Sequence, residues 1–457
     1  MHPNECFDGV PFSRDMGASL VGDPSSEAQA VKRTRLNAPQ RVLCTRWGPL
    51  DNGLIILTKP IRTNSIVSVN VSLKMGSLYE TDDKAGLCTL MQNTILKGTK
   101  TRTSEQIAEE LESMGTRISS SADREYGTVS LQSTSESLYA SLEVLYDILL
   151  NATFPQDAVD LQKRLQTRNI LARRDQPINR AVELMVEAQY GAHPFHKPAM
   201  GYPETVERLT REDLLKSYAA AYVPNNMVIT AVGNFDERRL IIAIGRALDG
   251  IARGEAFSTQ RVPGDLPVHA APVEKVEQRE GAASWLALGW FSPSLTDPDY
   301  YTMEVLDAIT GGSMNSRLFV AIREKRGLAY QVSSFVNARM ETGIYAVYLG
   351  TKPESYKEAM SVLLEEVFRM KKEEASAEEI TLAKNYLRGM FIMGQESNAG
   401  QAAQYGHDEI LGLGYDFGDR YYLPGIQKAT ARDIVRVGGK YLTDAYSLGA
   451  VVIKSAQ

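Results

Sequence analysis

The chain repeats its own pattern once, and this internal repeat constrains the fold more than any other feature of the sequence. The stretch 126–145 reads as a strand, a turn and a helix, and it returns at 342–367, about 210 residues later. The segment 210–233 returns in the same way near 430. A chain of 457 residues is too long for one hydrophobic core. The repeat therefore predicts two similar domains of roughly 200 residues each.

Each copy mixes strands with helices. Segments 53–60 and 65–77 alternate β-branched and polar residues, as strands do. Segment 104–115 is an amphipathic helix pattern opened by Ser104, and 126–134 and 136–150 read as a strand and a helix. Such an order favours an α+β fold of two homologous tandem domains, each a mainly antiparallel sheet packed with helices.

Changes in composition set the expected domain limits. Residues 1–47 are polar, without sustained periodicity, and are interpreted as an N-terminal arm. The first domain is expected at 48–257 and the second at 282–457. The segment 258–281, which carries prolines and charges, is the expected linker.

Charge and composition exclude several functional classes. The net charge is -6, and no long block of lysine or arginine occurs, which argues against nucleic acid or an anionic membrane as a partner. No apolar stretch approaches the length of about 18 residues that a membrane span needs, and no signal peptide is visible. We therefore expect a soluble protein, cytoplasmic by default, and periplasmic or organellar if this is a processed chain.

Cysteine and histidine offer no evident metal site. Cys6, Cys44 and Cys88 form no CxxC pair, so the sequence predicts neither a disulfide framework nor a thiolate zinc site. Cys88 is expected to be a small core residue. The chain has five histidines. His193 and His196 are three apart, but prolines on both sides break a helix there, so a surface turn is expected. His407 is expected to be solvated or capped.

Two motifs carry a resemblance to a known family. "GLCTLMQNTILKGT" at 86–99 reads as a helix that ends in Lys-Gly-Thr, and "GGSMNSRLFVAIREKRGLAYQVSS" occupies 311–334 in the second half. With its tandem halves, the sequence resembles the M16 (pitrilysin or insulinase-like) metallopeptidases over roughly residues 48–455. That family includes the mitochondrial processing peptidase subunits and the core proteins of cytochrome bc1 complexes.

Active members of the family carry H-x-x-E-H on the first-half helix, with a third zinc ligand about 75 residues later. Residues four apart share one face of a helix, so two imidazoles can bind one ion, and the glutamate between them reaches a zinc-bound water. The resemblance places Thr89 and Asn93 at the two histidines and Gln92 at the glutamate. Asn169 falls at the third ligand.

All four of these side chains are neutral. Amide and hydroxyl oxygens do not hold zinc without imidazole, thiolate or carboxylate partners, and an amide cannot act as a general base. We therefore expect a degenerate site with no metal, no cofactor and no catalytic residue in this chain. The helix persists because its other face, which includes Leu90 and Met91, has core spacing.

The second-half motif matches the family better. In active members an arginine and a tyrosine seven residues apart reach the substrate, and Arg323 and Tyr330 have that spacing. The resemblance implies that both bind substrate, and that Gly311 and Gly312 belong to a glycine loop that touches it. A structural interpretation stays open, in which Arg323 lies on a solvated helix end and Tyr330 only begins a strand.

Three functional hypotheses follow. The leading one is a zinc-less subunit that pairs with a homologous subunit carrying an intact H-x-x-E-H, so that the two enclose an unfolded peptide. The alternative is a structural subunit of a larger complex, such as a membrane complex, without proteolysis. The third is an independently active peptidase that uses a site the sequence does not reveal.

Overall fold

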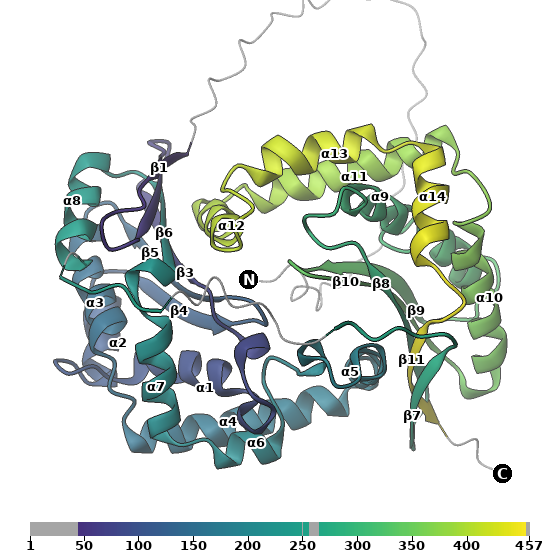
Figure 1. Ribbon diagram of the computed structural model, residues 1–457, viewed down its shortest axis with the longest axis horizontal. Helices are drawn as coiled ribbons and strands as arrows, with labels where there is room; N and C mark the ends of the chain where they lie inside the picture. Colours follow the sequence, from purple (N-terminus) through teal and green to yellow (C-terminus); the bar gives the residue numbers. More distant parts are fainter. Residues whose placement is uncertain (1–43, 249, 256–264, 454–457) are drawn as a thin grey trace, which may run out of the picture. The chain divides into compact units, whose positions relative to one another are not determined.

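The computed structural model describes residues 44–248, 250–255 and 265–453, and Figure 1 shows the arrangement of its elements. Most of the expected arm and part of the expected linker lie outside these ranges. The last residues of the arm, Thr45–Trp47, form strand β1, which pairs antiparallel with the next strand. Trp47 Nε1 also donates a hydrogen bond of 2.8 Å to Thr58 Oγ1 on that strand. The domain limits themselves stay a prediction.

The first sheet has six strands in the order β1-β2-β6-β3-β5-β4. Its strands are β1 (Thr45–Trp47), β2 (Ile55–Pro60), β3 (Ile66–Leu73), β4 (Arg117–Ala122), β5 (Gly127–Thr134) and β6 (Met227–Gly233). Only β2 and β6 run parallel, and the other neighbours are antiparallel. The predicted strands at 53–60, 65–77 and 126–134 are confirmed as β2, β3 and β5.

The first half of the sequence has eight helices within the described ranges, and most of them pack against this sheet and against one another around one apolar core, to which α5 does not contribute. The helices are α1 (Leu87–Thr94), α2 (Ser104–Ser113), α3 (Leu138–Asn151), α4 (Gln156–Asp175), α5 (Pro177–Tyr190), α6 (Pro203–Arg208), α7 (Arg211–Ala221) and α8 (Glu237–Leu248), with short 3-10 turns η1 (Ser77–Tyr79), η2 (Asp82–Lys84), η3 (Ile95–Lys97), η4 (Pro194–His196) and η5 (Pro224–Asn226). The predicted helices at 104–115 and 136–150 are confirmed as α2 and α3. Thr103, not Ser104, caps α2, because its side chain accepts the Gln106 N–H.

The second sheet has five strands in the order β7-β11-β8-β10-β9. They are β7 (Val273–Arg279), β8 (Ser284–Ser292), β9 (Gln331–Ala338), β10 (Gly343–Thr351) and β11 (Ser447–Ile453). Here too only one pair, β7 with β11, is parallel. The two sheets therefore share an antiparallel plan with a single parallel pair.

The second half adds its own helices and a second apolar core. These elements are α9 (Tyr300–Thr310), α10 (Tyr356–Arg369), α11 (Ala377–Gly394), α12 (Asn398–Ile410), α13 (Leu423–Lys428) and α14 (Ala431–Tyr441), with a 3-10 turn η8 (Pro353–Ser355) and two π-helical turns η7 (Phe319–Glu324) and η9 (Gly418–Tyr422). The α+β class with two similar, mainly antiparallel halves is confirmed. No helix within the described ranges combines the length and the apolar composition that a membrane span requires.

The repeat is visible in local details of the backbone. Gly115 and Gly327 have φ angles of 61° and 62°, in the left-handed region that glycine adopts without strain. Helices α7 and α14 both begin with a capping box, in which Thr210 and Thr430 each exchange hydrogen bonds with an aspartate three residues on. The two halves therefore use the same start and stop signals at corresponding places.

Two helices pack on the sheet of the opposite half, which the sequence pattern did not predict. Helix α5 follows α4 in the first half, yet it packs on β11, β8 and β7 of the second sheet. Helix α12 belongs to the second half and packs on β3 and β6 of the first sheet. Figure 1 shows α12 beside the first sheet and α5 beside the second. The two halves are thus joined by exchanged helices.

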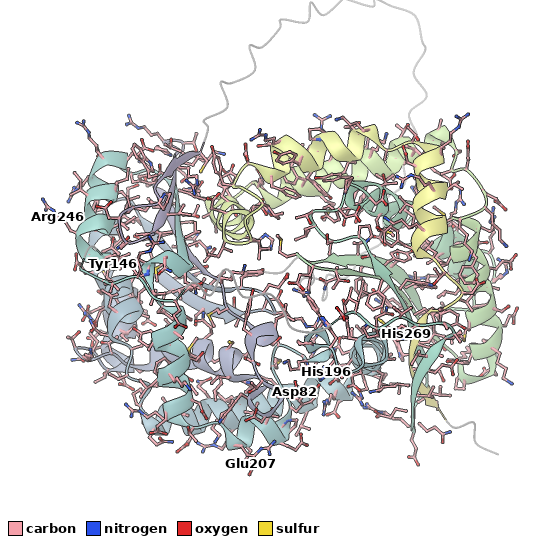
Figure 2. The ribbon with its side chains drawn as sticks, viewed as in Figure 1. Asp82, Tyr146, His196, Glu207, Arg246 and His269 are labelled. Carbon is pink, nitrogen blue, oxygen red and sulfur yellow. The ribbon has the colours of Figure 1, made fainter. Side chains whose placement is uncertain are left out.

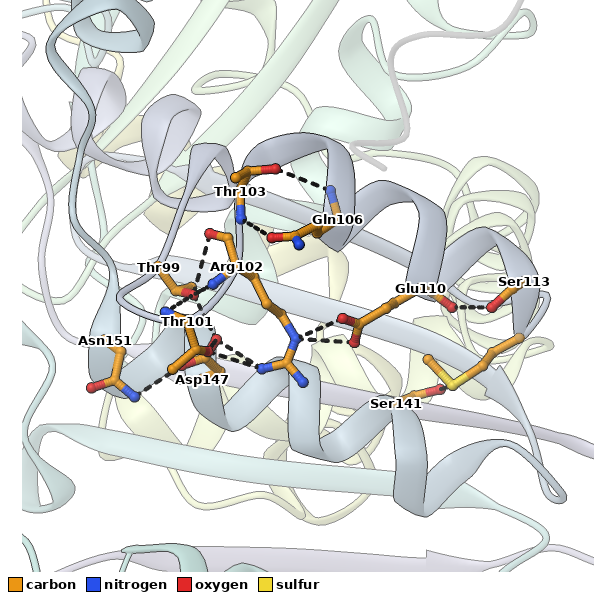
Figure 3. A network of polar contacts seen from close by, with 11 residues as sticks. Thr99, Thr101, Arg102, Thr103, Gln106, Glu110, Ser113, Ser141, Asp147 and Asn151 are labelled. Carbon is orange, nitrogen blue, oxygen red and sulfur yellow. Dashed lines mark hydrogen bonds and ion pairs between the residues drawn. The ribbon is translucent and has the colours of Figure 1, made fainter.

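A polar network fixes the chain just after α1 (Figure 3). Asp147 on α3 accepts hydrogen bonds from Thr99 Oγ1 at 2.6 Å and Thr101 Oγ1 at 2.7 Å, and Arg102 Nη1 lies 2.9 Å from the same carboxylate. Arg102 Nε also contacts both oxygens of Glu110. Burial alone would raise the pKa of Asp147, but these hydrogen bonds outweigh it and lower the pKa. The network holds the Lys-Gly-Thr end of the helix that carries the candidate site.

Candidate functional site

The N-terminus of α1 is capped by a carboxylate from outside the helix. Glu80 is buried, and its two oxygens accept the backbone N–H groups of Gly86 at 2.8 Å and Cys88 at 2.6 Å. Burial raises the pKa of Glu80, although both hydrogen bonds favour its charged form. Lys197 Nζ donates to the carbonyl oxygen of Glu80 at 2.5 Å and ties the loop around 197 to this cap.

Thr89 and Asn93 lie one helical turn apart on α1 and face neighbouring segments. Thr89 Oγ1 donates a hydrogen bond of 2.6 Å to the carbonyl oxygen of Ala199. Asn93 Nδ2 lies 3.5 Å from Oε1 of Gln166 on α4. The amide of Gln166 also donates to Gly86 O at 3.0 Å and to Met200 O at 2.9 Å. Gln166 therefore connects α1, α4 and the loop at 199–200.

Gln92 has a separate environment and is fully buried. Its Oε1 accepts a 2.8 Å hydrogen bond from the hydroxyl of Tyr222 on the chain just after α7, and its Nε2 lies 3.5 Å from the sulfur of Met75. Burial raises the pKa of Tyr222 well above its ordinary value, so the phenol stays protonated and keeps donating. The side chain of Gln92 thus contacts Tyr222 and Met75, and within the described part of the chain it makes no hydrogen bond to the side chain of Thr89 or Asn93.

The structure places Gln166 of α4 beside Asn93. Asn169 is exposed on α4, whereas Gln166 is 1 % exposed. A sequence signal could have found it. The buried positions of α4 are Val159, Gln166 and Ile170, which share one helical face, and Asn169 lies off that face. The assignment of Asn169 to the third-ligand position came from its distance along the chain and stays a prediction; Gln166 is the residue of α4 whose contact with Asn93 the structure shows.

The donor atoms around Thr89, Asn93 and Gln166 do not match a zinc site. Protein zinc sites take imidazole, thiolate or carboxylate ligands, and these three side chains offer a hydroxyl and two amides. The amide of Gln166 donates to two backbone carbonyls, so its Nε2 edge faces the protein. Within residues 44–248, 250–255 and 265–453, no group of three or more His, Cys, Asp or Glu side chains is arranged to hold a metal.

His193, His196 and His269 each contact backbone atoms of other residues through a ring nitrogen. His193 Nδ1 accepts the Phe195 N–H at 3.3 Å at the start of η4, and His196 Nδ1 lies 2.9 Å from His193 O. His269 Nε2 lies 2.8 Å from Gln189 O. Figure 2 labels His196 near Asp82, whose carboxylate pairs with Lys197 at 3.3 Å. A turn is present here as η4, but it is not the expected surface turn, because His193 and Phe195 are buried.

His407 sits at the interface between α12 and the first half. Its Nδ1 lies 3.0 Å from a carboxylate oxygen of the next residue, Asp408. Its ring meets the ring of Tyr126 edge-on, with centroids 4.8 Å apart. These contacts fit the expected capped position.

Arg323 lies at the end of the π-helical turn η7, with an exposed side chain. Its guanidinium sits over the ring of Phe319 at 5.1 Å, and no hydrogen bond or ion pair joins it to another described residue. Two nearby arginines, in contrast, have ion-pair or hydrogen-bond partners. Arg317 pairs with Glu379 at 2.7 Å, and Arg326 Nη1 donates to Ala321 O. Arg323 therefore keeps its planar set of donors available to solvent.

Tyr330 directly precedes β9, the edge strand of the second sheet. Its side chain is 54 % exposed, and its backbone N–H donates to Gly350 O at 2.8 Å. The backbone is thus anchored while the phenol faces outward. Whether Arg323 and Tyr330 bind a substrate stays a prediction.

Gly311 and Gly312 end α9, and packing explains both. Their N–H groups donate to Asp307 O at 2.9 Å. A Cβ on Gly311 would lie 2.5 Å from Ser334 Oγ, and a Cβ on Gly312 would lie 2.9 Å from Asp307 Oδ2. Gly311 thus allows close contact between the end of α9 and β9, whereas Gly312 packs against α9 itself, and contact of either glycine with a substrate stays a prediction.

Two recessed carboxyl groups beside this glycine pair were missed by the sequence reasoning. Burial raises the pKa of Glu304 to about 8, and the neighbouring Asp307 adds to the shift. Burial also raises the pKa of Asp307 to about 7, against a hydrogen bond from Ser334. Tyr422 donates to Glu304 Oε2 at 3.2 Å. Their spacing of three residues on α9 was the available signal, since such residues share a face.

Comparison with family models matches both halves of the chain. The model described as insulinase (peptidase family M16) matches residues 55–202. The model described as peptidase M16 inactive domain matches residues 208–387. The two matches follow one another and together cover most of the described structure.

Sequence relatives span nearly the whole chain. An uncharacterized zinc protease of Rickettsia bellii (strain RML369-C) is 29% identical over 404 residues, which cover 87% of this chain and 94% of the relative. The uncharacterized zinc protease YmxG of Bacillus subtilis (strain 168) is 25% identical over 362 residues, covering 79% of this chain and 87% of the relative.

Solved structures share the fold. A peptidase M16 inactive domain from Pseudomonas fluorescens superimposes with a TM-score of 0.82 at 21% identity, covering 91% of this chain and 99% of that one. A protease from Helicobacter pylori gives 0.81 at 19% identity, covering 90% and 99%. With two consecutive family-model matches, full-length relatives and the same tandem fold, the chain belongs to the M16 family of peptidase-like proteins.

Proposed function

We propose that this chain is a non-catalytic subunit of an M16 peptidase-like complex. It pairs with a homologous subunit that carries an intact H-x-x-E-H, and it contributes Arg323, Tyr330 and part of the wall around an unfolded peptide. The observation that carries the proposal is the contrast between its two candidate sites. The first-half site has only neutral donors engaged with the protein, and the second-half arginine is exposed and unpaired among the described residues.

The chemistry of Arg323 and Tyr330 suits peptide binding. A guanidinium offers a rigid fork of N–H donors to a peptide carbonyl. A phenol can stabilise the oxyanion that forms when hydroxide attacks that carbonyl, if the hydroxide comes from a metal held by the partner. Removing one such donor from an active site lowers kcat by roughly 100- to 1000-fold. Both side chains would then act on a reaction started by the other subunit.

The test begins with the native complex, purified together with its partner chains and assayed for peptide cleavage. Arg323→Ala and Tyr330→Phe are expected to lower cleavage by roughly 100-fold while assembly stays intact. Arg388→Ala and Tyr386→Phe, exposed residues of the same types on α11, serve as matched controls and are expected to leave cleavage unchanged. Equal activity in all four variants would contradict the proposed role of Arg323 and Tyr330.

The same preparation distinguishes the structural alternative. A complex that contains membrane-complex subunits and cleaves no peptide would support the scaffold function in place of the proposed one. For the isolated chain, we expect less than one equivalent of tightly bound zinc and no peptidase activity, because amide and hydroxyl ligands hold zinc weakly. Stoichiometric zinc with chelator-sensitive cleavage by the chain alone would contradict the zinc-less assignment.

A further inference from the structure

The two exchanged helices are held on their sheets by different kinds of contact. Helix α5 packs on an apolar surface of the second sheet, in a cluster that joins Ala181, Leu184 and Met185 to residues such as Ala346 and Val451. Backbone also approaches closely there, since a Cβ on Gly449 of β11 would lie 2.0 Å from Ala181 O. Apolar surface of this kind is costly to return to water.

Charged groups add to the attachment of α5. Arg180 Nε lies 2.8 Å from Glu277 on β7, and its Nη1 lies 3.3 Å from Glu187. Lys275, also on β7, reaches Glu187 at 2.9 Å. The pairs with Glu277 and Lys275 connect α5 to β7. Apolar packing and a network of charged groups therefore both hold α5 on the second sheet.

Helix α12 packs on a surface that is partly polar. Four buried polar residues of the first sheet lie below it: Ser68, Asn70 and Ser72 on β3, and Thr230 on β6. Gly406 of α12 faces them so closely that a Cβ would lie 2.6 Å from Ser72 Oγ, 3.0 Å from Thr230 Oγ1 and 3.1 Å from Asn70 Nδ2. We call these four residues the polar floor.

The polar floor is incompletely satisfied. Asn70 Nδ2 donates to Ser72 Oγ at 2.8 Å and Asn70 Oδ1 accepts from Ser130 Oγ at 2.7 Å. The hydroxyls of Ser68 and Thr230, in contrast, have no hydrogen-bond partner among the described residues. A buried hydroxyl without a partner destabilises the state in which α12 is docked on the sheet. The hydroxyl regains hydrogen bonds when water reaches it. Opening α12 would therefore hydrate hydroxyls and an amide, which offsets much of its cost.

The remaining attachments of α12 lie mostly along its sides and ends. Asn398 Nδ2 donates to Ile66 O at 2.9 Å at its first residue. Glu409 pairs with Arg46 at 2.6 Å near its last residue, and Arg46 is partly exposed. Tyr405 joins a small apolar cluster with Leu57 and Val232. Ala402 of α12 lies in the same cluster, so the contact combines this apolar cluster with the polar floor under Gly406.

We propose that α12 is a detachable strap, which opens from the first sheet as a unit while α5 stays docked on the second sheet. Free energies of local opening within one protein range from near zero to that of global unfolding, and the easily opened elements have few buried apolar contacts. Helix α12 buries Ala402 and Tyr405 in the apolar cluster on the first sheet, fewer residues than α5 buries on the second sheet, and polar side chains lie under Gly406. The inference concerns the fold of this chain and does not depend on its proposed function.

Native-state hydrogen–deuterium exchange of the intact chain tests the proposal, read by mass spectrometry for peptides that cover α12 and α5. In the unaltered protein, α12 is expected to exchange sooner than α5. Exchange of the two helices at the same rate, up to the rate of global unfolding, would overturn the proposal.

Gly406→Ala gives a second test, because helix propensity and the clash with the polar floor predict opposite effects on exchange in α12. Alanine favours a helix over glycine, so helix propensity alone would slow exchange in α12. The clash with the polar floor predicts the opposite, an opening that is roughly tenfold or more favoured, with α5 unchanged. Gly389→Ala in α11, where a Cβ meets nothing within 4 Å, is the matched control and is expected not to speed exchange. Slower α12 exchange in Gly406→Ala would contradict the strap.

Thr230→Val keeps the proposal testable if Gly406→Ala fails to fold. It removes an unpartnered hydroxyl with little change of shape, so α12 is expected to exchange several-fold more slowly. Ser130→Ala removes a hydroxyl that does have a partner and is expected to give no such protection. Equal effects of the two substitutions on α12 would count against the polar floor as the cause of opening.

Discussion

At the residue scale, the candidate first-half site keeps the geometry of a shared face but not the ligands that would use it. Thr89 and Asn93 lie on the same face of α1, as their spacing predicted, and each contacts another segment of the same polypeptide. Gln166 is the residue that organises them, through hydrogen bonds to Gly86 O and Met200 O. Hydrogen bonds, and not metal ligands, connect α1, α4 and the loop at 199–200. The local fold therefore does not need a charged ligand at these positions.

Replacing Gln166 tests this connection. Gln166→Ala removes both donors and leaves two carbonyl oxygens and a small cavity in the interior, so we expect a loss of about 2–4 kcal/mol in the free energy of unfolding. Asn169→Ala changes an exposed side chain on the same helix and is expected to stay within about 0.5 kcal/mol. Denaturant titration of both variants measures the difference. A larger loss for Asn169→Ala than for Gln166→Ala would contradict the connecting role of Gln166.

Glu304 and Asp307 predict a pH dependence whose sign is opposite to that of most carboxyl groups. Both have a raised pKa in the folded chain, to about 8 and about 7. The folded state therefore holds protons that the unfolded state has already released above pH 4 or so. Stability contributed by these protons is present at low pH and is lost as pH rises from about 4 toward 8.

Glu304→Gln isolates this contribution. The amide cannot ionise, and its carbonyl oxygen can still accept from Tyr422, so we expect a gain of roughly 1–3 kcal/mol over the unaltered chain at pH 8.5, shrinking toward pH 5. Thermal or denaturant unfolding at several pH values measures it. Parallel stability profiles of the variant and the unaltered chain across this range would show that Glu304 does not titrate as proposed.

At the scale of elements, the sequence predicted what local rules control and missed what depends on tertiary packing. Alternation located β2 and β5, and helical periodicity located α2 and α3, each to within a few residues. The periodicity of α5 shows that one face is buried but not against which sheet, so its exchange could not be foreseen. Asn169 was chosen by its distance along the chain, which carries no information about helical phase, and so the contact between Gln166 and Asn93 was not predicted.

Gly115 and Gly245 test how far the conformational preference of the backbone alone determines the effect of a substitution on stability. A Cβ at either position meets nothing within 4 Å, so space does not distinguish them. Gly115 has a φ of +61°, and alanine there costs about 1 kcal/mol. Gly245 lies within α8 at ordinary helical φ, where alanine stabilises by up to about 1 kcal/mol. Opposite shifts in Tm are expected, and shifts of the same sign would show that packing outweighs backbone preference.

At the scale of the whole molecule, exchanged helices make the two halves depend on each other. The repeat suggests two domains that could fold separately, yet the second sheet receives α5 from the first half, and the first sheet receives α12 from the second. Cutting the chain in the linker would leave each sheet without one covering helix. In isolation, the apolar cluster that α5 forms with β8, β10 and β11 would be exposed on both fragments.

Expression of residues 1–262 and 263–457 as separate fragments tests this dependence. Each fragment alone is expected to bind a hydrophobic dye and to aggregate, because half of the α5 interface faces water. Co-expression is expected to give a one-to-one complex, since the contacts between the halves do not require a continuous chain. Size-exclusion chromatography with light scattering measures both outcomes. Two monomeric fragments that bind no dye and do not associate would show that each half completes its own core, and that the exchange of α5 and α12 adds contact without being needed for folding.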